Sequence, residues 1–143
     1  MKNTTCSVII TKMIEGVNHL LMVHPTGNKT WDIPKGIADP DEPHILAAKR
    51  ELQEETGFIV NETDLVDLGI FKYRPEKDMH VFQYKGNSLF ECSNGVCIST
   101  FTCHYTKTQK PEVDAFKYVP ITDVPLICNK SFLKIFEDIK DKL

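Results

Sequence analysis

The sequence predicts a mixed α/β (α+β) fold in which a mixed β-sheet is covered by helices, in an α/β/α layer arrangement. Three observations support this prediction. Short runs rich in β-branched residues are separated by polar turns, two segments carry apolar residues at helical spacing, and strands and helices do not alternate regularly. No repeat or Gly/Ser linker divides the 143 residues, so we expect one domain spanning residues 1–143.

Strands are expected along much of the chain. Residues 6–14 (CSVIITKMI) and 19–24 (HLLMVH) predict two paired strands joined by the turn-like residues 15–18. Further strands are expected at residues 30–33, 58–60, 65–73, 80–86 and 115–120, and the polar segment 87–110 contains one strand-like run at 96–102.

Two helices are expected. Within residues 43–56, Ile45, Ala48 and Leu52 fall on one stripe, and Gly57 stands where a left-handed C-terminal cap belongs. From Lys130 onward, apolar residues at helical spacing predict a closing helix packed on the core; they are Phe132, Ile135, Phe136 and Ile139.

Composition argues against several classes of protein. No apolar run approaches the roughly 18 residues of a membrane helix, and the N-terminus lacks the cleavage site of a secretory signal. We therefore expect a cytoplasmic protein with no membrane partner. The net charge of −3 provides no broad basic footprint for duplex DNA, although a small nucleotide or an RNA end remains a candidate partner.

The five cysteines are an odd number in a chain without a secretory signal, which favours reduced thiols over a disulfide framework. Cys92, Cys97 and Cys103 lie near His104 in the sequence. Only Cys92 and Cys97, with four residues between them, reach the gap of roughly two to four residues that zinc-ligand pairs show. Because a zinc site needs four ligands at tighter pair spacing, it is not favoured.

Three glutamates of the first helix are the most informative residues. On a helix that advances about 100° per residue, Glu51, Glu54 and Glu55 fall in one sector beside the apolar stripe. Such carboxylates are commonly a solvated face, but like charges at these spacings destabilise a helix. Hard divalent cations such as Mg²⁺ take oxygen ligands, so the spacing indicates a metal site.

Residues outside this sector suit the same task. Gly36 has no Cβ, so the backbone can bend there and direct its carbonyl at the same metal. Lys35 would place an ammonium near phosphate oxygens. Arg50 is one of two arginines in the chain, and its planar fork can orient Glu51 or Glu42.

Residues 36–58 resemble the Nudix box. The resemblance rests on Gly36, Glu42 and the run RELQEETGF from Arg50 to Phe58. The flanking segments WDIPKG (31–36), RPEKDMHVF (74–82) and KPEVDAFKYVPITDV (110–124) are similar to segments of family members, the last to those of RNA 5′-pyrophosphohydrolases and dinucleoside polyphosphate hydrolases.

The resemblance implies hydrolysis of the pyrophosphate linkage of a nucleoside diphosphate derivative with Mg²⁺ or Mn²⁺, in the α/β/α sandwich of the Nudix family. Candidate substrates are a dinucleoside polyphosphate, an ADP-ribose-like nucleotide and an RNA 5′-triphosphate end. Phosphoryl transfer requires charge neutralisation and an aligned water, which clustered carboxylates with a divalent metal supply.

The box residues are accordingly the candidate catalytic machinery. Glu51, Glu54, Glu55 and the Gly36 carbonyl are predicted metal ligands, and Arg50 is predicted to orient a carboxylate. Either Glu54 or Glu51 would take the proton from the attacking water. Beyond the box, Glu112 is a candidate ligand or base, with an exposed strand entrance as the alternative.

Substrate contacts are predicted on both sides of the box. Lys35, Arg74 and Lys77 are candidates for phosphate binding, although Lys77 fits a solvated lysine equally well. Trp31 and Tyr73 are candidates for stacking on a base, although both also suit core positions. His80 alternates with apolar neighbours and is expected to be half-buried on a strand.

Two other functions remain open. A non-catalytic nucleotide-sensing module would bind the nucleotide without cleaving it, and it would usually lack some of the box carboxylates that are present here. A cysteine-based metal or redox protein would be recognised by bound zinc or by thiol titration.

Overall fold

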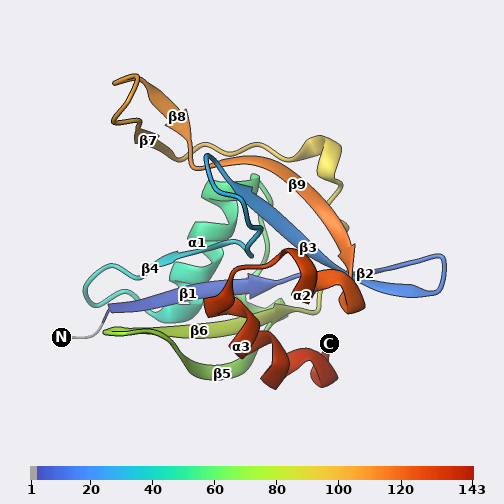
Figure 1. The fold of residues 1–143 in the computed structure, drawn as a ribbon. Coiled ribbons are helices and arrows are strands. Elements are labelled where there is room, and N and C mark those ends of the chain that lie inside the picture. Colours follow the sequence, from blue (N-terminus) through green and yellow to red (C-terminus); the bar gives the residue numbers. More distant parts are fainter. Residues whose placement is uncertain (1–2) are drawn as a thin grey trace.

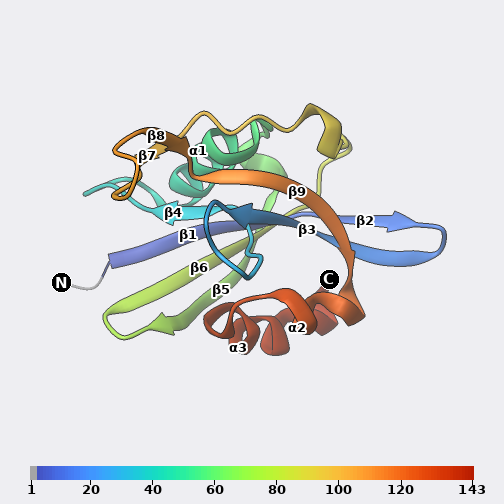
Figure 2. The same ribbon diagram turned by 45° about the horizontal axis from the view of Figure 1, so that its top comes forward.

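Two β-sheets form the middle layer of the structure, with α1 (His44–Thr56) on one side and α3 (Lys130–Ile139) on the other (Figure 1, Figure 2). The computed structural model describes residues 3–143, so the first two residues of the expected domain lie outside the described part. The three layers and the mixed strand directions confirm the predicted fold class.

The first sheet has four strands in the order β4 (Lys35–Ile37), β1 (Asn3–Ile9), β6 (Lys77–Tyr84) and β5 (Leu65–Arg74). β1 and β6 are parallel, and the other pairs are antiparallel. The second sheet is antiparallel, with β2 (Thr11–Ile14), β3 (Val17–Pro25) and β9 (Val113–Pro120) in that order.

The remaining elements are short. β7 (Thr100–Thr102) and β8 (Gln109–Pro111) form a hairpin that projects from the layers beyond the start of β9 (Figure 1). The short helices are η1 (Glu62–Asp64), η2 (Cys92–Asn94), η3 (Ile121–Asp123), α2 (Val124–Ile127) and η4 (Lys140–Lys142). Within residues 3–143, no helix is long and apolar enough to cross a membrane.

Alternation along the strands builds a core on each face of the sheets. Successive strand residues point to opposite faces, so Val8 packs in the α1 core while Ile9 packs in the α3 core. On β3, Leu21 and its neighbour Leu20 divide in the same way. Both helices therefore bury their apolar stripes against the same strands.

The helix ends follow local rules. Gly57 has φ 81° and donates its N–H to the carbonyl of Gln53 at 2.8 Å, which confirms the predicted left-handed cap of α1. Asn129 caps α3, since its side chain accepts a hydrogen bond from the N–H of Phe132 at 2.8 Å.

Several strand predictions were wrong. Residues 6–14 are not one strand, because β1 ends at Ile9 and only β2 pairs with β3. Trp31 and Asp32 form isolated bridges rather than a strand, whereas Lys35–Ile37, expected as a turn, forms β4. Residues 58–60 are not a strand, although Val60 is buried in the α1 core.

The run at 96–102 is a strand only over Thr100–Thr102. Its earlier residues bond the end of α1 instead, with Val96 N–H donating to Thr56 and Ile98 N–H to Glu54. The run therefore binds the helix end through its backbone, while the side chains of Val96 and Ile98 are 57% and 63% exposed. Local periodicity cannot distinguish such a segment from a paired strand.

Candidate active site

The glutamates of α1 lie at the edge of its buried stripe. Leu52 is fully buried and fixes the orientation of the helix. Glu55 is 6% exposed, and the side chains of Glu51 and Glu54 are 12% and 35% exposed. The helix thus presents three carboxylates along a gradient from buried to half-exposed.

Gly36 provides the space for one of these carboxylates. It lies on β4, where it pairs with Cys6 of β1. A Cβ at this position would overlap the carboxylate of Glu51. Next to it, the backbone N–H of Lys35 donates to Oε1 of Glu55 at 2.9 Å. The short strand β4 therefore holds two of the three carboxylates against the sheet edge.

Arg50 organises the other side of the cluster. Its Nε and Nη2 donate to the two carboxylate oxygens of Glu42, each at 2.9 Å. Its Nη1 donates to Glu51 at 2.9 Å and lies 3.4 Å from both oxygens of Glu54. Of the two partners expected for Arg50, Glu42 receives the bidentate contact and Glu51 a single one.

Burial and mutual repulsion raise the proton affinity of two carboxyls. Burial, and then the charge of Glu54, raises the pKa of Glu51 to about 7. Burial raises the pKa of Glu55 to about 8, against the opposing charge of Lys35. In contrast, the hydrogen bonds from Arg50 lower the pKa of Glu42 to about 2. Glu51 and Glu55 thus keep their protons to a higher pH than ordinary carboxyls, because the neighbouring cations only partly offset the effect of burial.

A buried ionic network supports β4 from the opposite layer. Asp32 is buried, and its Oδ2 accepts hydrogen bonds from Lys35 Nζ at 2.9 Å and Asn129 Nδ2 at 2.8 Å. Burial is the largest single influence on the Lys35 ammonium and lowers its pKa, but the charge and hydrogen bond of Asp32, together with the charges of Tyr73 and Glu55, outweigh it and the pKa is raised. Because Asn129 caps α3, this network connects α3 to the strand that holds the glutamates.

Sequence reasoning did not identify Asp32 or Asn129. The i,i+3 spacing of Asp32 and Lys35 was a visible signal for an ion pair. The contact with Asn129 bridges residues far apart in the chain, so local pattern could not indicate it. The Lys35 ammonium, predicted to contact phosphate, is directed to Asp32 in this structure.

Glu112 lies close enough to the cluster to affect its charge. It stands between β8 and β9, where its backbone N–H donates to Ser99 and its carbonyl accepts from Thr26, both at 3.0 Å. Its negative charge contributes to the raised pKa of both Glu51 and Glu55. The side chain is exposed, and its role as a ligand or base stays a prediction.

The other predicted contact residues are not gathered with the glutamates. Tyr73 is buried in the α3 core. The Arg74 guanidinium lies 4.7 Å from the ring centroid of Tyr73 and donates to Ser131 of α3. Lys77 begins β6, two strands from β4. Trp31 packs against the α3 core, with the Lys117 ammonium 4.4 Å from its ring centroid.

His44, the first residue of α1, contacts His80 of β6. His80 is half-buried on β6, as its alternation predicts. Its Nδ1 lies 2.9 Å from Nδ1 of His44, so one ring must donate and the other accept. Its Nε2 lies 2.9 Å from a carboxylate oxygen of Asp67. Cys92, Cys97 and Cys103 are free thiols.

The donor set of the α1 face fits a hard divalent cation. Glu51, Glu54 and Glu55 supply carboxylate oxygens, and Gly36 leaves open the space that a Cβ would fill. In the part of the chain that is described, no three His, Cys, Asp or Glu side chains converge as a ready-made cage. Glu51 and Glu54 turn to Arg50 and Glu55 turns to Lys35, so these contacts would rearrange on metal binding.

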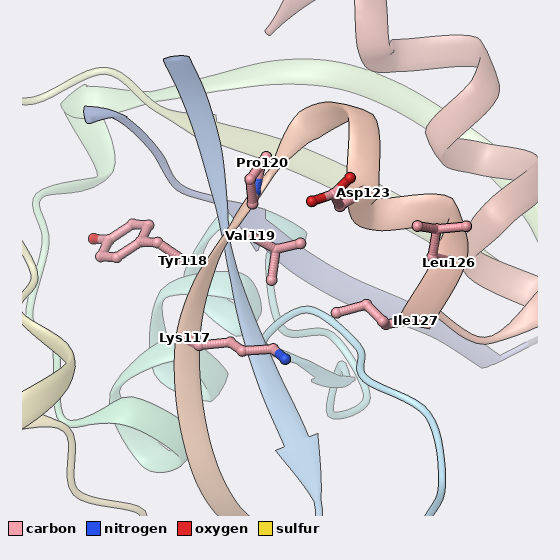
Figure 3. A pocket seen from close by; sticks show the side chains of 7 residues that line it. All are labelled: Lys117, Tyr118, Val119, Pro120, Asp123, Leu126 and Ile127. Carbon is pink, nitrogen blue, oxygen red and sulfur yellow. The ribbon is translucent and has the colours of Figure 1, made fainter. Parts of the chain in front are cut away.

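A hollow of about 290 Å³ lies elsewhere, between β9 and α2 (Figure 3). Its charged lining residues are Lys117 and Asp123, and Leu126 and Ile127 form its apolar wall. None of the predicted site residues lines this hollow. The carboxylate face of α1, rather than this hollow, is therefore the candidate active site.

Comparison with known sequences identifies relatives. The sequence profile of the NUDIX domain matches residues 3–137. An uncharacterized 17.7 kDa protein in the e-segB intergenic region of Enterobacteria phage T4 is 33% identical over 97% of each chain. An RNA pyrophosphohydrolase of Pelagibacter ubique is 25% identical, over 79% of this chain and 73% of the relative.

Solved structures share the fold at low sequence identity. The NUDIX domain of Shewanella oneidensis NrtR, complexed with ADP ribose, matches with a TM-score of 0.70 at 15% identity, covering 99% of this chain and 88% of that one. A binary complex of C. elegans Ap4A hydrolase matches with a TM-score of 0.68 at 17% identity, covering 96% of each chain.

The chain therefore belongs to the NUDIX family. Its class is that of the Nudix hydrolases, enzymes that act on phosphoanhydride bonds.

Proposed function

We propose that this Nudix hydrolase cleaves the pyrophosphate linkage of a nucleoside diphosphate derivative with the help of Mg²⁺ or Mn²⁺. The observation that carries the proposal is the seating of Glu51 against Gly36, next to Glu55 held by the Lys35 N–H. Buried carboxylates therefore lie directly against the backbone of Gly36, which has no side chain. Such a site suits a hard cation and the phosphates that accompany it.

Glu51, Glu54, Glu55 and the Gly36 carbonyl would hold the metal, with Glu112 as a further ligand. When bound, a divalent cation neutralises phosphate charge and lowers the pKa of a coordinated water. Burial, with the neighbouring carboxylate charges, raises the pKa of Glu51 and Glu55, and a bound cation would favour the ionised form of both.

The chain's own residues position the reacting groups. Arg50 fixes the direction of Glu51 and Glu54 through Nη1, while Glu42 fixes Arg50. Either Glu51 or Glu54 takes the proton from the attacking water.

The proposed substrates are small nucleotides or an RNA 5′ end. The relatives include an RNA pyrophosphohydrolase, and the structural neighbours include an Ap4A hydrolase and a domain bound to ADP ribose. The net charge of −3 favours such substrates over duplex DNA. Five free thiols suit a cytoplasmic setting.

The test is a phosphate-release panel with Mg²⁺ or Mn²⁺, offering diadenosine polyphosphates, ADP-ribose, NADH, a dNTP and a 5′-triphosphate RNA. Glu54→Gln should reduce turnover by about a hundredfold or more with little change in folding, because Glu54 is partly exposed and the amide keeps its shape. Retained activity in this variant would show that the metal site does not include Glu54 and lies elsewhere in the chain. Nucleotide binding without any turnover would identify a sensing module.

A further inference from the structure

A second hollow, which we name the arm pocket, lies where the β7–β8 hairpin meets the loop after β3. Its volume is about 220 Å³. The hairpin reaches beyond the layers at the start of β9 (Figure 1). Its lining includes Thr26 from the loop and Phe101, Tyr105 and Lys110 from the hairpin.

The chemistry of the arm pocket suits an aromatic ligand attached to an anion. Tyr105 is 98% exposed and Phe101 is 38% exposed, so two aromatic rings face solvent. From Cys92 to Pro111 the chain contains no Asp or Glu, although its net charge is −3. Lys107 and Lys110 therefore give this segment a positive charge. Aromatic side chains stack on bases, and nearby cations attract phosphates.

The wall of the arm pocket also contains an unpaired polar group. The hydroxyl of Thr26 is buried and has no hydrogen-bond partner among residues 3–143. Buried polar atoms are usually paired, so an unpaired one calls for an explanation. The polar edge of a bound base would supply a partner if the wall side chains adjust around it.

The arm pocket adjoins the carboxylate face. Thr26 donates its N–H to the carbonyl of Glu112, and the N–H of Glu112 donates to Ser99, both at 3.0 Å. The N–H of Ile98 bonds the carbonyl of Glu54 at 2.7 Å. Lys110 stands two residues before Glu112, about 7 Å along an extended chain. A ligand could therefore reach from the glutamates into the pocket.

We propose that the arm pocket binds the nucleobase of a second nucleoside, at the far end of a polyphosphate chain that lies over Glu51, Glu54 and Glu55. This inference rests on the proposed function and narrows its substrates to dinucleoside polyphosphates. The volume agrees with one ring system, because it is below the roughly 300–1,000 Å³ of pockets for drug-sized ligands.

The test compares substrates with one and two bases. Phe101→Ala and Tyr105→Ala should raise KM for diadenosine tetraphosphate about tenfold, since stacking on one base contributes roughly 1–3 kcal/mol. KM for ADP-ribose and both kcat values should change less than about twofold. Leu126→Ala is the control, because it removes a 79% exposed apolar side chain on α2, outside the arm pocket. Phe101→Tyr, which keeps an aromatic ring at this position, should have the wild-type KM for diadenosine tetraphosphate.

Three results would overturn the proposal. These are an equal change in KM for both substrates, no change for either, or an effect seen only with a 5′-triphosphate RNA. If the wild-type protein hydrolyses no nucleotide, the proposed function fails but the arm pocket is still testable. Calorimetry should then show that Tyr105→Ala weakens the binding of diadenosine tetraphosphate and leaves the affinity for ADP unchanged. Circular dichroism verifies that each variant is folded.

Discussion

The guanidinium of Arg50 binds both carboxylate oxygens of Glu42, each at 2.9 Å, while its remaining nitrogen reaches Glu51 at the same distance. This contact joins the loop before α1 to the helix itself. The pairing lowers the pKa of Glu42 to about 2 and raises that of Arg50. Arg50 is therefore charged and fixed in direction before any substrate arrives.

Arg50→Lys should impair catalysis more than folding. Lysine keeps the charge but cannot bind Glu42 through two parallel hydrogen bonds while also reaching Glu51. We expect kcat to fall about 10- to 100-fold, as for other residues that orient ligands. The control is Lys49→Met, which removes the exposed pair with Glu62 on the same helix. The measurement is the steady-state kcat of both variants. Equal kcat values for Arg50→Lys and Lys49→Met would show that Arg50 does not orient the glutamates.

Gly36→Ala should displace the carboxylate of Glu51. The added Cβ would overlap this carboxylate, which is the end of a side chain and can rotate away. We therefore expect turnover to fall about a hundredfold while Tm changes by only a few degrees. Ile37→Ala, at a partly exposed site on the same strand, is the control. Full activity with a folded Gly36→Ala protein would remove Glu51 from the proposed metal site.

Asp32→Asn should destabilise the fold. Asp32 is buried, and removing its charge leaves the Lys35 ammonium without its partner. Breaking a buried pair costs roughly 3–5 kcal/mol, and we expect the lower end because the Lys35 side chain keeps 22% exposure. Tm should fall by about 6–12 °C. The double variant Asp32→Asn/Lys35→Met should recover part of this loss, and a double variant that melts still lower would refute the pairing.

The carboxylate face could be predicted from sequence because it is encoded locally. Glu51, Glu54 and Glu55 are one, three and four residues apart and lie on one face of a single helix. Gly57 ends that helix in the left-handed backbone conformation, which few residues other than glycine adopt. The three-layer arrangement also followed from the two apolar helical stripes. These features depend on residues a few positions apart, so periodicity is sufficient to find them.

Partners distant in the chain could not be predicted in this way. Residues 6–14 were predicted as one strand but divide between two sheets. The reason is that β1 pairs with β4 and β6, whereas β2 pairs with β3. Lys35 has the chemistry of a phosphate contact, yet in the fold its ammonium pairs with Asp32. Asp32 also accepts a hydrogen bond from Asn129, the residue that caps α3. Such outcomes depend on which segments meet in space, and strand propensity carries little of that information.

The stability of the metal-free protein should decrease as pH rises. Folding raises the pKa of Glu51 to about 7 and of Glu55 to about 8, from an ordinary value of 4.5. Between these values the folded chain binds more protons than the unfolded chain, so raising the pH favours unfolding. The stabilisation is complete below the ordinary pKa and is lost through about pH 7–8.

In EDTA, Tm should therefore fall by roughly 10 °C between about pH 5 and pH 8.5. Glu55→Gln should flatten this dependence, because the amide does not titrate and can still accept from the Lys35 N–H. Added Mg²⁺ should raise Tm more at the higher pH, where both carboxylates are ionised. A Tm that rises with pH in EDTA would show that the negative charges of Glu51 and Glu55 are already compensated in the folded chain without a metal.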